Sequence, residues 1–296
     1  MALVAEHEAH KVPEGASARR GPAPFGAPRE SLGHRFVYLV VSSRARGLSV
    51  GVNLNPDRRC NFDCAYCEVD RRAPIRDRHL DVEVVEKELE ATLEQVHAGQ
   101  LNCYRQLPEE LLRLRHVALS GDGEPTLCPQ FAEVVRALVH VRARGRFPFF
   151  KIVLLTNATA LDQPAVQSGL KLLIHEDEIW AKLDGGTAGY LKRVNHPQMD
   201  LSRVLANILL IGRQRPIVIQ SLFPVLDGEE PSDQEIASYA SRLQELKAGG
   251  AQIALVQIYS ATRPPMNGAC GHLPLKTLSK IAHRVRAETG LGVEVF

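Results

Sequence analysis

KIVLLTNATALDQPAVQSGLKLLIHEDEIWAKLDGGT, residues 151–187, holds one full repeat of the pattern that decides the fold. Two short apolar runs, at residues 151–156 and 178–183, have the length and composition of strands that are buried on both faces. Between them, Asp162 and Pro164 begin a short segment with helical spacing of its apolar residues. This order predicts two parallel strands joined by a helix that packs on the sheet.

The same alternation extends on both sides of this repeat. Further compact apolar runs occupy residues 48–54, 116–120, 217–223 and 253–259. Six strands are too few to close an eight-stranded barrel, so we expect an α/β fold, a partial (β/α)6 TIM-like barrel with a parallel curved sheet. Residues 35–41 form a β-type run before the first core strand and predict a hairpin with it. Functional groups are expected at the carboxyl ends of the strands.

Three parts are predicted along the chain. Residues 1–33 are rich in Pro, Gly and Ala, lack apolar periodicity and predict a flexible N-terminal arm. Residues 34–265 hold the repeating core with its N-terminal hairpin, and residues 266–296 predict a C-terminal helix and a short strand. The core and C-terminal helices are expected near residues 82–96, 131–139, 164–173, 201–208, 232–246 and 275–288.

Composition limits the class of protein. The 296 residues are 45% hydrophobic, and 36 basic against 34 acidic residues give a formal charge of +2, which does not favour a polyanionic partner. No apolar run approaches the roughly 20 residues that a membrane-spanning helix needs. The N-terminal residues do not resemble a secretory signal. We therefore expect a cytoplasmic protein with no membrane partner.

Three of the six cysteines stand together directly after the first core strand, in RRCNFDCAYCEVD at residues 58–70. Cys60, Cys64 and Cys67 have the spacing Cys-x3-Cys-x2-Cys, on a loop at the end of the barrel where an active site is expected. Three thiolates would leave one iron of a cuboidal 4Fe-4S cluster open to a small molecule. The alternative is a zinc site, or a cluster completed by one further ligand such as Cys103, Cys128 or Cys270.

CNFDCAYC resembles the signature of the radical S-adenosylmethionine (SAM) superfamily, including an aromatic residue, Tyr66, before the third cysteine. The resemblance covers residues from about 48 to 265. It implies a 4Fe-4S cluster on the three cysteines, with SAM bound to the open iron through its amino and carboxylate groups. Reduction would then cleave SAM to methionine and a 5'-deoxyadenosyl radical, which abstracts hydrogen from a substrate. Tyr66 would lie beside the adenine, although a packing role is equally ordinary.

Three other strand ends carry candidate SAM-binding residues. SGDGEPTL, residues 120–127, resembles the Gly-Gly-Glu element of the superfamily, where glycines let the backbone approach SAM and the acid binds its ammonium. TNAT, residues 156–159, offers hydrogen-bonding groups. In AKLDGGT, residues 181–187, the lysine and aspartate lie on one side of a strand and suit SAM, or pair with each other. The candidates are Gly121, Asp122, Gly123, Glu124, Asn157, Lys182 and Asp184.

KLDGGT together with VQIYSATRPP is most similar to the branch with the wyosine-forming tRNA enzymes, and more distantly to the first molybdenum-cofactor synthesis enzyme. Residues 1–59 lack the cysteines of a second cluster, so we expect one cluster. The predicted activity is hydrogen abstraction from a small-molecule or nucleoside substrate, with an external electron donor such as flavodoxin or ferredoxin. The alternatives are a glycyl-radical-enzyme activase and a non-catalytic iron–sulfur or zinc-binding module.

Two further sets of residues have weaker implications. His116 is expected at the surface or at a strand edge, because the histidines form no zinc signature. Six arginines crowd around the cysteines but alternate with acidic residues, so a solvated loop is one interpretation and a nucleic acid partner stays possible. These arginines are Arg58, Arg59, Arg71, Arg72, Arg76 and Arg78.

Overall fold

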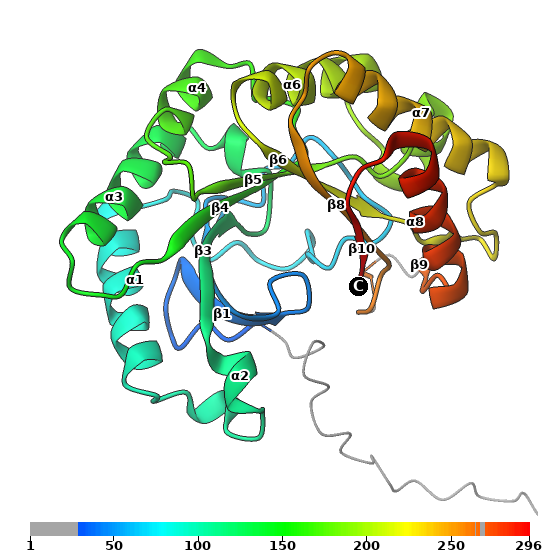
Figure 1. Cartoon of the computed structure of the whole chain (residues 1–296). Helices are drawn as coiled ribbons and strands as arrows, with labels where there is room; N and C mark the ends of the chain where they lie inside the picture. The colour runs from blue at the N-terminus through cyan, green and yellow to red at the C-terminus, as the bar shows by residue number, and fades with distance from the viewer. Residues whose placement is uncertain (1–28, 264, 267–269) are drawn as a thin grey trace, which may run out of the picture.

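The alternating strands form one curled sheet at the centre of the computed structural model, which describes residues 29–263, 265–266 and 270–296. Eight strands are hydrogen-bonded in the order β1-β2-β3-β4-β5-β6-β8-β10, and every neighbouring pair is parallel except β1 and β2. The sheet curls into a half-barrel with helices around its outer side (Figure 1). The predicted partial TIM-like barrel and its N-terminal hairpin are therefore confirmed.

The strand bounds agree closely with the apolar runs. A separate two-stranded sheet pairs β7 with β9. The strands are β1 (Val37–Ser42), β2 (Gly47–Asn53), β3 (Leu114–Ser120), β4 (Lys151–Thr156), β5 (Glu178–Lys182), β6 (Ile217–Leu222), β7 (Val225–Leu226), β8 (Ile253–Tyr259), β9 (Cys270–Gly271) and β10 (Val293–Val295).

Six helices follow the predicted periodicity, and two short ones, α2 and α5, were not predicted. Two 3₁₀ turns lie at Asn102–Tyr104 and Pro125–Leu127. The helices are α1 (Val82–His97), α2 (Glu109–Leu112), α3 (Phe131–Ala143), α4 (Pro164–Leu170), α5 (Ala188–Asn195), α6 (Leu201–Gln214), α7 (Asp233–Ala248) and α8 (Leu275–Thr289). None of those within the described residues is long and apolar enough to cross a membrane.

Alternate side chains of a strand face the hydrophobic core under the helices and the inside of the half-barrel. On β3, Val117 and Leu119 are fully buried in the main hydrophobic core. Their neighbours His116, Ala118 and Ser120 instead line a cavity inside the curl. Because successive side chains point to opposite faces of a sheet, the apolar run packs under the helices while its other face is available for a site.

The two edge strands of the sheet are bridged by the turn between β1 and β2. Arg46 in this turn forms an ion pair with Glu294 of β10, 2.9 Å from Nη2 to Oε1. On the outer side of β1, the Glu30 and Leu39 backbones exchange hydrogen bonds of 2.9 and 2.7 Å. The short C-terminal strand that we predicted thus pairs with β8 and is a seventh parallel strand of the same sheet.

The N-terminal arm predicted over residues 1–33 lies outside the described residues up to residue 28. The division of the chain into arm, core and C-terminal segment remains a prediction. In space, α8 packs against α7 and leads into β10, which continues the sheet of the core (Figure 1).

Candidate active site

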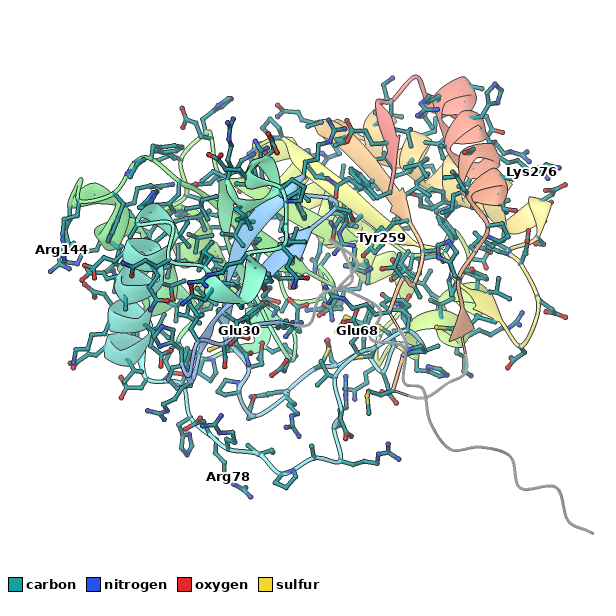
Figure 2. The ribbon with its side chains drawn as sticks, turned by 90° about the horizontal axis from the view of Figure 1, so that it is seen from below. Glu30, Glu68, Arg78, Arg144, Tyr259 and Lys276 are labelled. Atoms are coloured by element: carbon teal, nitrogen blue, oxygen red, sulfur yellow. The ribbon has the colours of Figure 1, made fainter. Side chains whose placement is uncertain are left out.

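A cavity of about 340 Å³ opens inside the half-barrel. Its walls come from β1 to β6 and β8, from the turn between β1 and β2, and from the loop that joins β2 to α1. Figure 2 shows Glu68 of this loop and Tyr259 of β8 near the middle of the molecule, while Arg144 lies at the periphery. The end of the sheet where an active site was predicted therefore holds a cavity lined by distant parts of the chain.

The three clustered cysteines lie in the loop after β2. Cys60 and Cys64 line the cavity. Cys67 does not line it, but its backbone N–H donates to the Cys64 carbonyl oxygen at 2.9 Å. Burial raises the pKa of Cys64 to about 12 and also raises that of Cys60, so a metal that binds these thiols must displace their protons. Among the described residues, no three His, Cys, Asp or Glu side chains are already gathered closely enough to hold a metal ion.

The donor set fits a 4Fe-4S cluster with one open iron. All three candidate ligands are free thiols on a single loop at the cavity, which is the ligand chemistry of such clusters. The other three cysteines are also free, but none of them lines this cavity. Within the described part of the chain, a fourth thiol ligand is therefore not offered from the cavity wall.

The segment after β3 packs tightly against the end of β2 and against the cysteine loop, and two glycines permit these contacts. A Cβ at Gly123 would lie 2.1 Å from the Arg59 carbonyl oxygen. At Gly121, where φ is +134°, a Cβ would lie 2.1 Å from Asn53 Oδ1. The Glu124 N–H donates to the same Arg59 carbonyl at 3.0 Å. The glycines thus have a packing role in addition to their predicted approach to SAM.

Replacing Gly123 by alanine should disturb both the fold and the cysteine loop. The new methyl group meets backbone that cannot rotate away, so we expect the free energy of unfolding to fall by about 1–3 kcal/mol. Iron incorporation on reconstitution should fall with it, because the loop start is displaced. Gly189→Ala is the matched control, since nothing lies within 4 Å of its Cβ position. Chemical denaturation and iron analysis measure both effects, and equal results for the two variants would contradict the packing role.

The Glu124 carboxylate ties the ends of β3 and β4 together. Its Oε1 accepts hydrogen bonds from Thr156 Oγ1 at 2.5 Å and from Thr126 Oγ1 at 2.6 Å. Its Oε2 accepts one from the Asn157 N–H at 2.7 Å. Burial raises the pKa of Glu124, and these donors oppose the rise. Oε2 therefore keeps room for one more donor. Asn157 lines the cavity too, and its Nδ2 donates to Asn61 Oδ1 at 2.8 Å.

Lys182 and Asp184 form a buried ion pair, with 3.1 Å between Nζ and Oδ1. Nζ also donates to the Tyr259 hydroxyl at 2.9 Å. The Tyr66 hydroxyl donates to Asp184 Oδ2, and Asn195 Nδ2 donates to the same oxygen at 2.8 Å. Burial alone would lower the pKa of Lys182, but the Asp184 charge and the Tyr259 hydroxyl raise it. The two charges therefore pair with each other, as one of the sequence alternatives had it. A contact of either with SAM stays a prediction.

Asn195 belongs to this network, although no sequence motif pointed to it. It ends α5, and its Nδ2 lies 3.2 Å from Cys64 Sγ as well as contacting Asp184. A signal for α5 exists in the sequence, because Thr187 caps the helix by accepting a hydrogen bond from the Tyr190 N–H at 3.2 Å. The helix thus links the cysteine loop to the end of β5.

Glu235 holds the loop that carries Asp184. Its Oε1 accepts a hydrogen bond from the Gly186 N–H at 2.5 Å, and its Oε2 accepts one from Thr187 Oγ1 at 2.6 Å. Ser232 and Glu235 have the S-x-x-E spacing of a capping box, and Ser232 Oγ accepts a hydrogen bond from the Glu235 N–H at 3.1 Å. The Glu235 side chain, however, does not return to Ser232 and binds the loop after β5 instead. This contact fixes the backbone two residues beyond Asp184.

Among the predicted SAM-binding residues, Asp122 and Asp184 do not line the cavity. Asp122 follows β3. Its Oδ1 accepts a hydrogen bond from Arg29 at 2.8 Å, and its Oδ2 accepts one from Asn53 Nδ2 at 2.8 Å. Asp122 therefore connects the end of β3 with β2 and with the segment before β1, whereas Gly121, Gly123 and Glu124 line the cavity.

His116 is buried, with 3% exposure, so the expectation that it lies at the surface or at a strand edge is wrong. Its ring packs edge-on against Trp180, 5.3 Å between centroids. Burial, followed by the charges of Lys151 and Arg44, lowers the pKa of His116 to about 3. The sequence could not predict this burial. In a strand that is buried on both faces, the residue pattern does not distinguish positions that face the inside of the half-barrel from positions that face the helices.

We expect His116 to make the fold sensitive to acid. The unfolded chain binds a proton near pH 6.5 and the folded chain only near pH 3, so the unfolded state holds more protons in this range. The free energy of unfolding should fall, as pH drops below 6.5, by about 1.4 kcal/mol per pH unit from this group. Denaturation of the wild type and of His116→Asn at several pH values measures the difference. Parallel pH profiles would contradict a neutral, buried His116.

Residues 54–240, more than half of the chain, match the family model of the Radical SAM superfamily. The chain therefore belongs to this superfamily, as its cysteine motif predicted, and it is an enzyme that uses a 4Fe-4S cluster and SAM. It is similar to proteins called UPF0026. One from Helicobacter pylori is 26% identical over 264 residues, which is 82% of this chain and 78% of the relative. Another from Synechocystis is 27% identical and covers 58% of this chain and 57% of the relative.

Solved structures share the fold at low sequence identity. A structure of TYW1 with a lysine-pyruvate adduct has a TM-score of 0.55 at 15% identity and covers 85% of this chain and 84% of its own. SuiB from Streptococcus suis, bound to S-adenosylmethionine, has a TM-score of 0.56 at 13% identity, over 81% and 49% of the two chains. A radical SAM methyltransferase from Sphaerobacter thermophilus has a TM-score of 0.57 at 14% identity, over 88% and 68%. These likenesses establish the half-barrel fold alone.

Proposed function

We propose that Cys60, Cys64 and Cys67 hold the cluster, and that the enzyme abstracts a hydrogen atom from a small-molecule or nucleoside substrate in the cavity. The cluster, when reduced, supplies the electron that cleaves SAM to methionine and a 5'-deoxyadenosyl radical. One observation carries the proposal: two of the three thiols line the same cavity as five of the seven strand-end residues predicted to bind SAM. A radical made there would meet a substrate inside the half-barrel.

The remaining residues are proposed to bind and orient SAM. The Oε2 atom of Glu124, with one protein donor, is suited to accept a hydrogen bond from the SAM ammonium. The backbone at Gly121 and Gly123 can approach the cofactor, because neither carries a side chain. Tyr66 and Lys182 line the cavity beside the cysteines, with Nζ 4.8 Å from the centroid of the tyrosine ring. Asp184 and Asn195 are positioning residues: Asp184 binds both Tyr66 and Lys182, and Asn195 binds Tyr66 and Asp184.

Anaerobic reconstitution with iron and sulfide, followed by dithionite and SAM, tests the activity. We expect 5'-deoxyadenosine and methionine in equal amounts. A protein that holds zinc after this treatment, or that carries a full cluster and yields no 5'-deoxyadenosine, would overturn the proposal. Cys103→Ser is a suitable control, because this exposed cysteine lies on a 3₁₀ turn away from the cavity and its loss should change neither iron content nor product.

Two of the six arginines around the cysteines bind the loop itself, which favours a small substrate over a nucleic acid. Arg58 donates to the backbone carbonyls of Ala73 and Pro74, and Arg71 donates to the Phe62 carbonyl at 2.6 Å. These arginines stabilise the loop itself, which reduces the basic surface that could face phosphates. Salt-dependent binding of RNA to the reconstituted enzyme would contradict this preference.

Members of this superfamily need an electron donor, and we propose an external flavodoxin or ferredoxin for this enzyme. The alternative of a glycyl-radical-enzyme activase predicts a second protein that gains an organic radical, detectable by electron paramagnetic resonance, after mixing with the reduced enzyme and SAM. Six cysteines free of disulfides suit a reducing compartment, so we propose a cytoplasmic location.

A further inference from the structure

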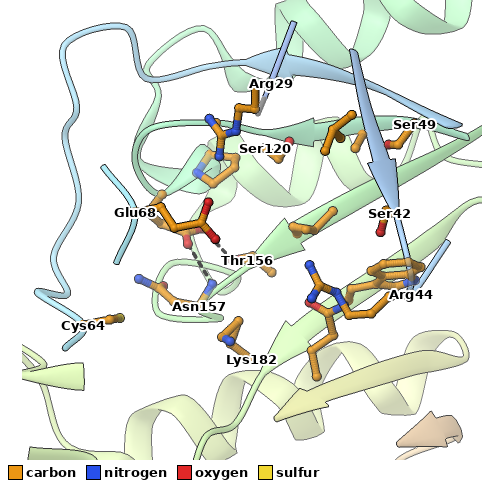
Figure 3. A pocket seen from close by; sticks show the side chains of 18 of the residues that line it. Arg29, Ser42, Arg44, Ser49, Cys64, Glu68, Ser120, Thr156, Asn157 and Lys182 are labelled. Carbon is orange, nitrogen blue, oxygen red and sulfur yellow. Dashed lines mark hydrogen bonds between the residues drawn. The ribbon is translucent and has the colours of Figure 1, made fainter. Parts of the chain in front are cut away.

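The cavity extends beyond the cysteines to a second group of polar side chains. Figure 3 shows Cys64 and Arg44 on opposite sides of the cavity, with Lys182 between them. Arg44 comes from the turn between β1 and β2, and its guanidinium stacks on the Tyr259 ring, 4.2 Å from Cζ to the centroid. The cavity therefore has two ends, one at the cluster ligands and one at Arg44.

The cations that line this cavity differ in how their charge is balanced. Arg29 pairs with Asp122 at 2.8 Å, and Lys182 pairs with Asp184 at 3.1 Å. Arg44 has neither an ion pair nor a hydrogen bond among the described residues, and its Nε is buried with no acceptor. A partly buried guanidinium without an acceptor costs free energy unless a ligand satisfies it.

Two more polar side chains at this end lack partners. Ser49 and His116 are each 3% exposed, line the cavity, and make no side-chain hydrogen bond to any described residue. They are register neighbours on β2 and β3, so both point into the half-barrel from adjacent strands. The neutral imidazole of His116 offers one N–H, and Ser49 offers one O–H. Together with Arg44 they form a set of hydrogen-bond donors for which no described residue supplies an acceptor.

We propose that the substrate carries a carboxylate, and that Arg44, Ser49 and His116 bind it at the end of the cavity away from Cys64. This inference rests on the proposed function and names the substrate class of the same site. The carboxylate of SAM is not the anion meant, because it would chelate iron beside the cysteines. The planar fork of Arg44 matches a carboxylate, which can accept two parallel hydrogen bonds from it.

Charge favours a carboxylate over a phosphate. Arg44 supplies one positive charge that no described acid balances, and the two other donors are uncharged. A carboxylate brings one negative charge, whereas a phosphate monoester brings about −1.5 to −2 near neutral pH. The excess negative charge would be held in a partly buried site without a counter-charge, which is unfavourable.

Calorimetric titration of the reconstituted, unreduced enzyme saturated with SAM tests the inference. The probes are a panel of small carboxylic acids, their matching primary amides, and inorganic phosphate. We expect acids from the panel to bind and their amides not to bind. Arg44→Gln should weaken the binding of those acids about 10- to 100-fold, and Ser49→Ala about 2- to 10-fold, which are the effects of losing a charged and a neutral hydrogen bond.

Arg46→Gln is the matched control, because Arg46 lies in the same turn but pairs with Glu294 outside the cavity and should leave binding unchanged. Circular dichroism checks each fold, and Ser49→Ala keeps the test open if Arg44→Gln does not fold. The inference is overturned if no acid binds, if amides bind as well as acids, if Arg44→Gln binds acids like the wild type, or if phosphate occupies the site in their place.

The failure of this inference can be separated from failure of the proposed function. The same wild-type preparation, reduced with dithionite, reports SAM cleavage through 5'-deoxyadenosine. Cleavage without binding of any acid would reject the carboxylate site alone. The reverse outcome is also distinct. If protein that carries the 4Fe-4S cluster binds acids through Arg44 but never cleaves SAM, the radical activity is rejected and the carboxylate site is kept.

Discussion

Cys64→Ala is expected to lose the cluster and, with it, all 5'-deoxyadenosine formation above background. The thiol lies at the cavity and is one of three candidate ligands, so its removal leaves only two on the loop. Iron analysis and the absorbance of the reconstituted variant measure the loss. The fold should persist, because the loop lies outside the packed strands.

Two observations make this prediction specific. Circular dichroism of Cys64→Ala should match that of the wild type, which separates loss of a ligand from loss of the fold. Cys103→Ala, at an exposed cysteine, should retain full iron and activity. Wild-type iron content in Cys64→Ala would show that the ligand assignment is wrong.

Asp184→Ala should lower the free energy of unfolding by about 3–5 kcal/mol, the usual effect of removing one partner from a buried ion pair. The Asp184 side chain is 1% exposed, and it balances the charge of Lys182. Its Oδ1 also accepts the Leu222 N–H at 2.8 Å, so the substitution leaves a buried backbone donor without an acceptor. Equilibrium chemical denaturation of the two proteins gives the difference.

A surface ion pair provides the comparison for Asp184→Ala. Glu229 pairs with Arg193 at 3.2 Å, but its side chain is 71% exposed. Glu229→Ala should therefore change the free energy of unfolding by no more than about 1 kcal/mol. If the two variants lost similar stability, the buried network around Lys182 would have no special role in holding the end of β5.

The sheet could be predicted because its strands are buried on both faces. All residues of β2 and β6 are buried, so each is a compact run without charged residues. α5 was missed because it is only eight residues long and begins one residue after two glycines, where a loop was the simpler interpretation. The parallel pairing of β10 with β8 depends on how α8 packs, which no local pattern reports.

The site was predictable where its residues stand in motifs and not where they meet through the fold. Cys60 and Cys64 lie at the cavity, as their spacing and position suggested. Arg44 stands in a polar turn that looks like solvent-exposed sequence, and only the curl of the sheet places it on Tyr259. Similarly, Ser49 and His116 become neighbours through the register of β2 on β3, which the sequence does not specify.

The open side of the curled sheet has a consequence for how this protein meets other copies of itself. A half-barrel leaves two strand edges that could template pairing with another chain, the route to aggregation and domain swapping. Here one edge, β10, is only three residues long, and the other, β1, has part of its ladder occupied by Glu30. Short and partly occupied edges give an incoming strand little to extend, so we expect edge-to-edge pairing between copies of this chain to be weak.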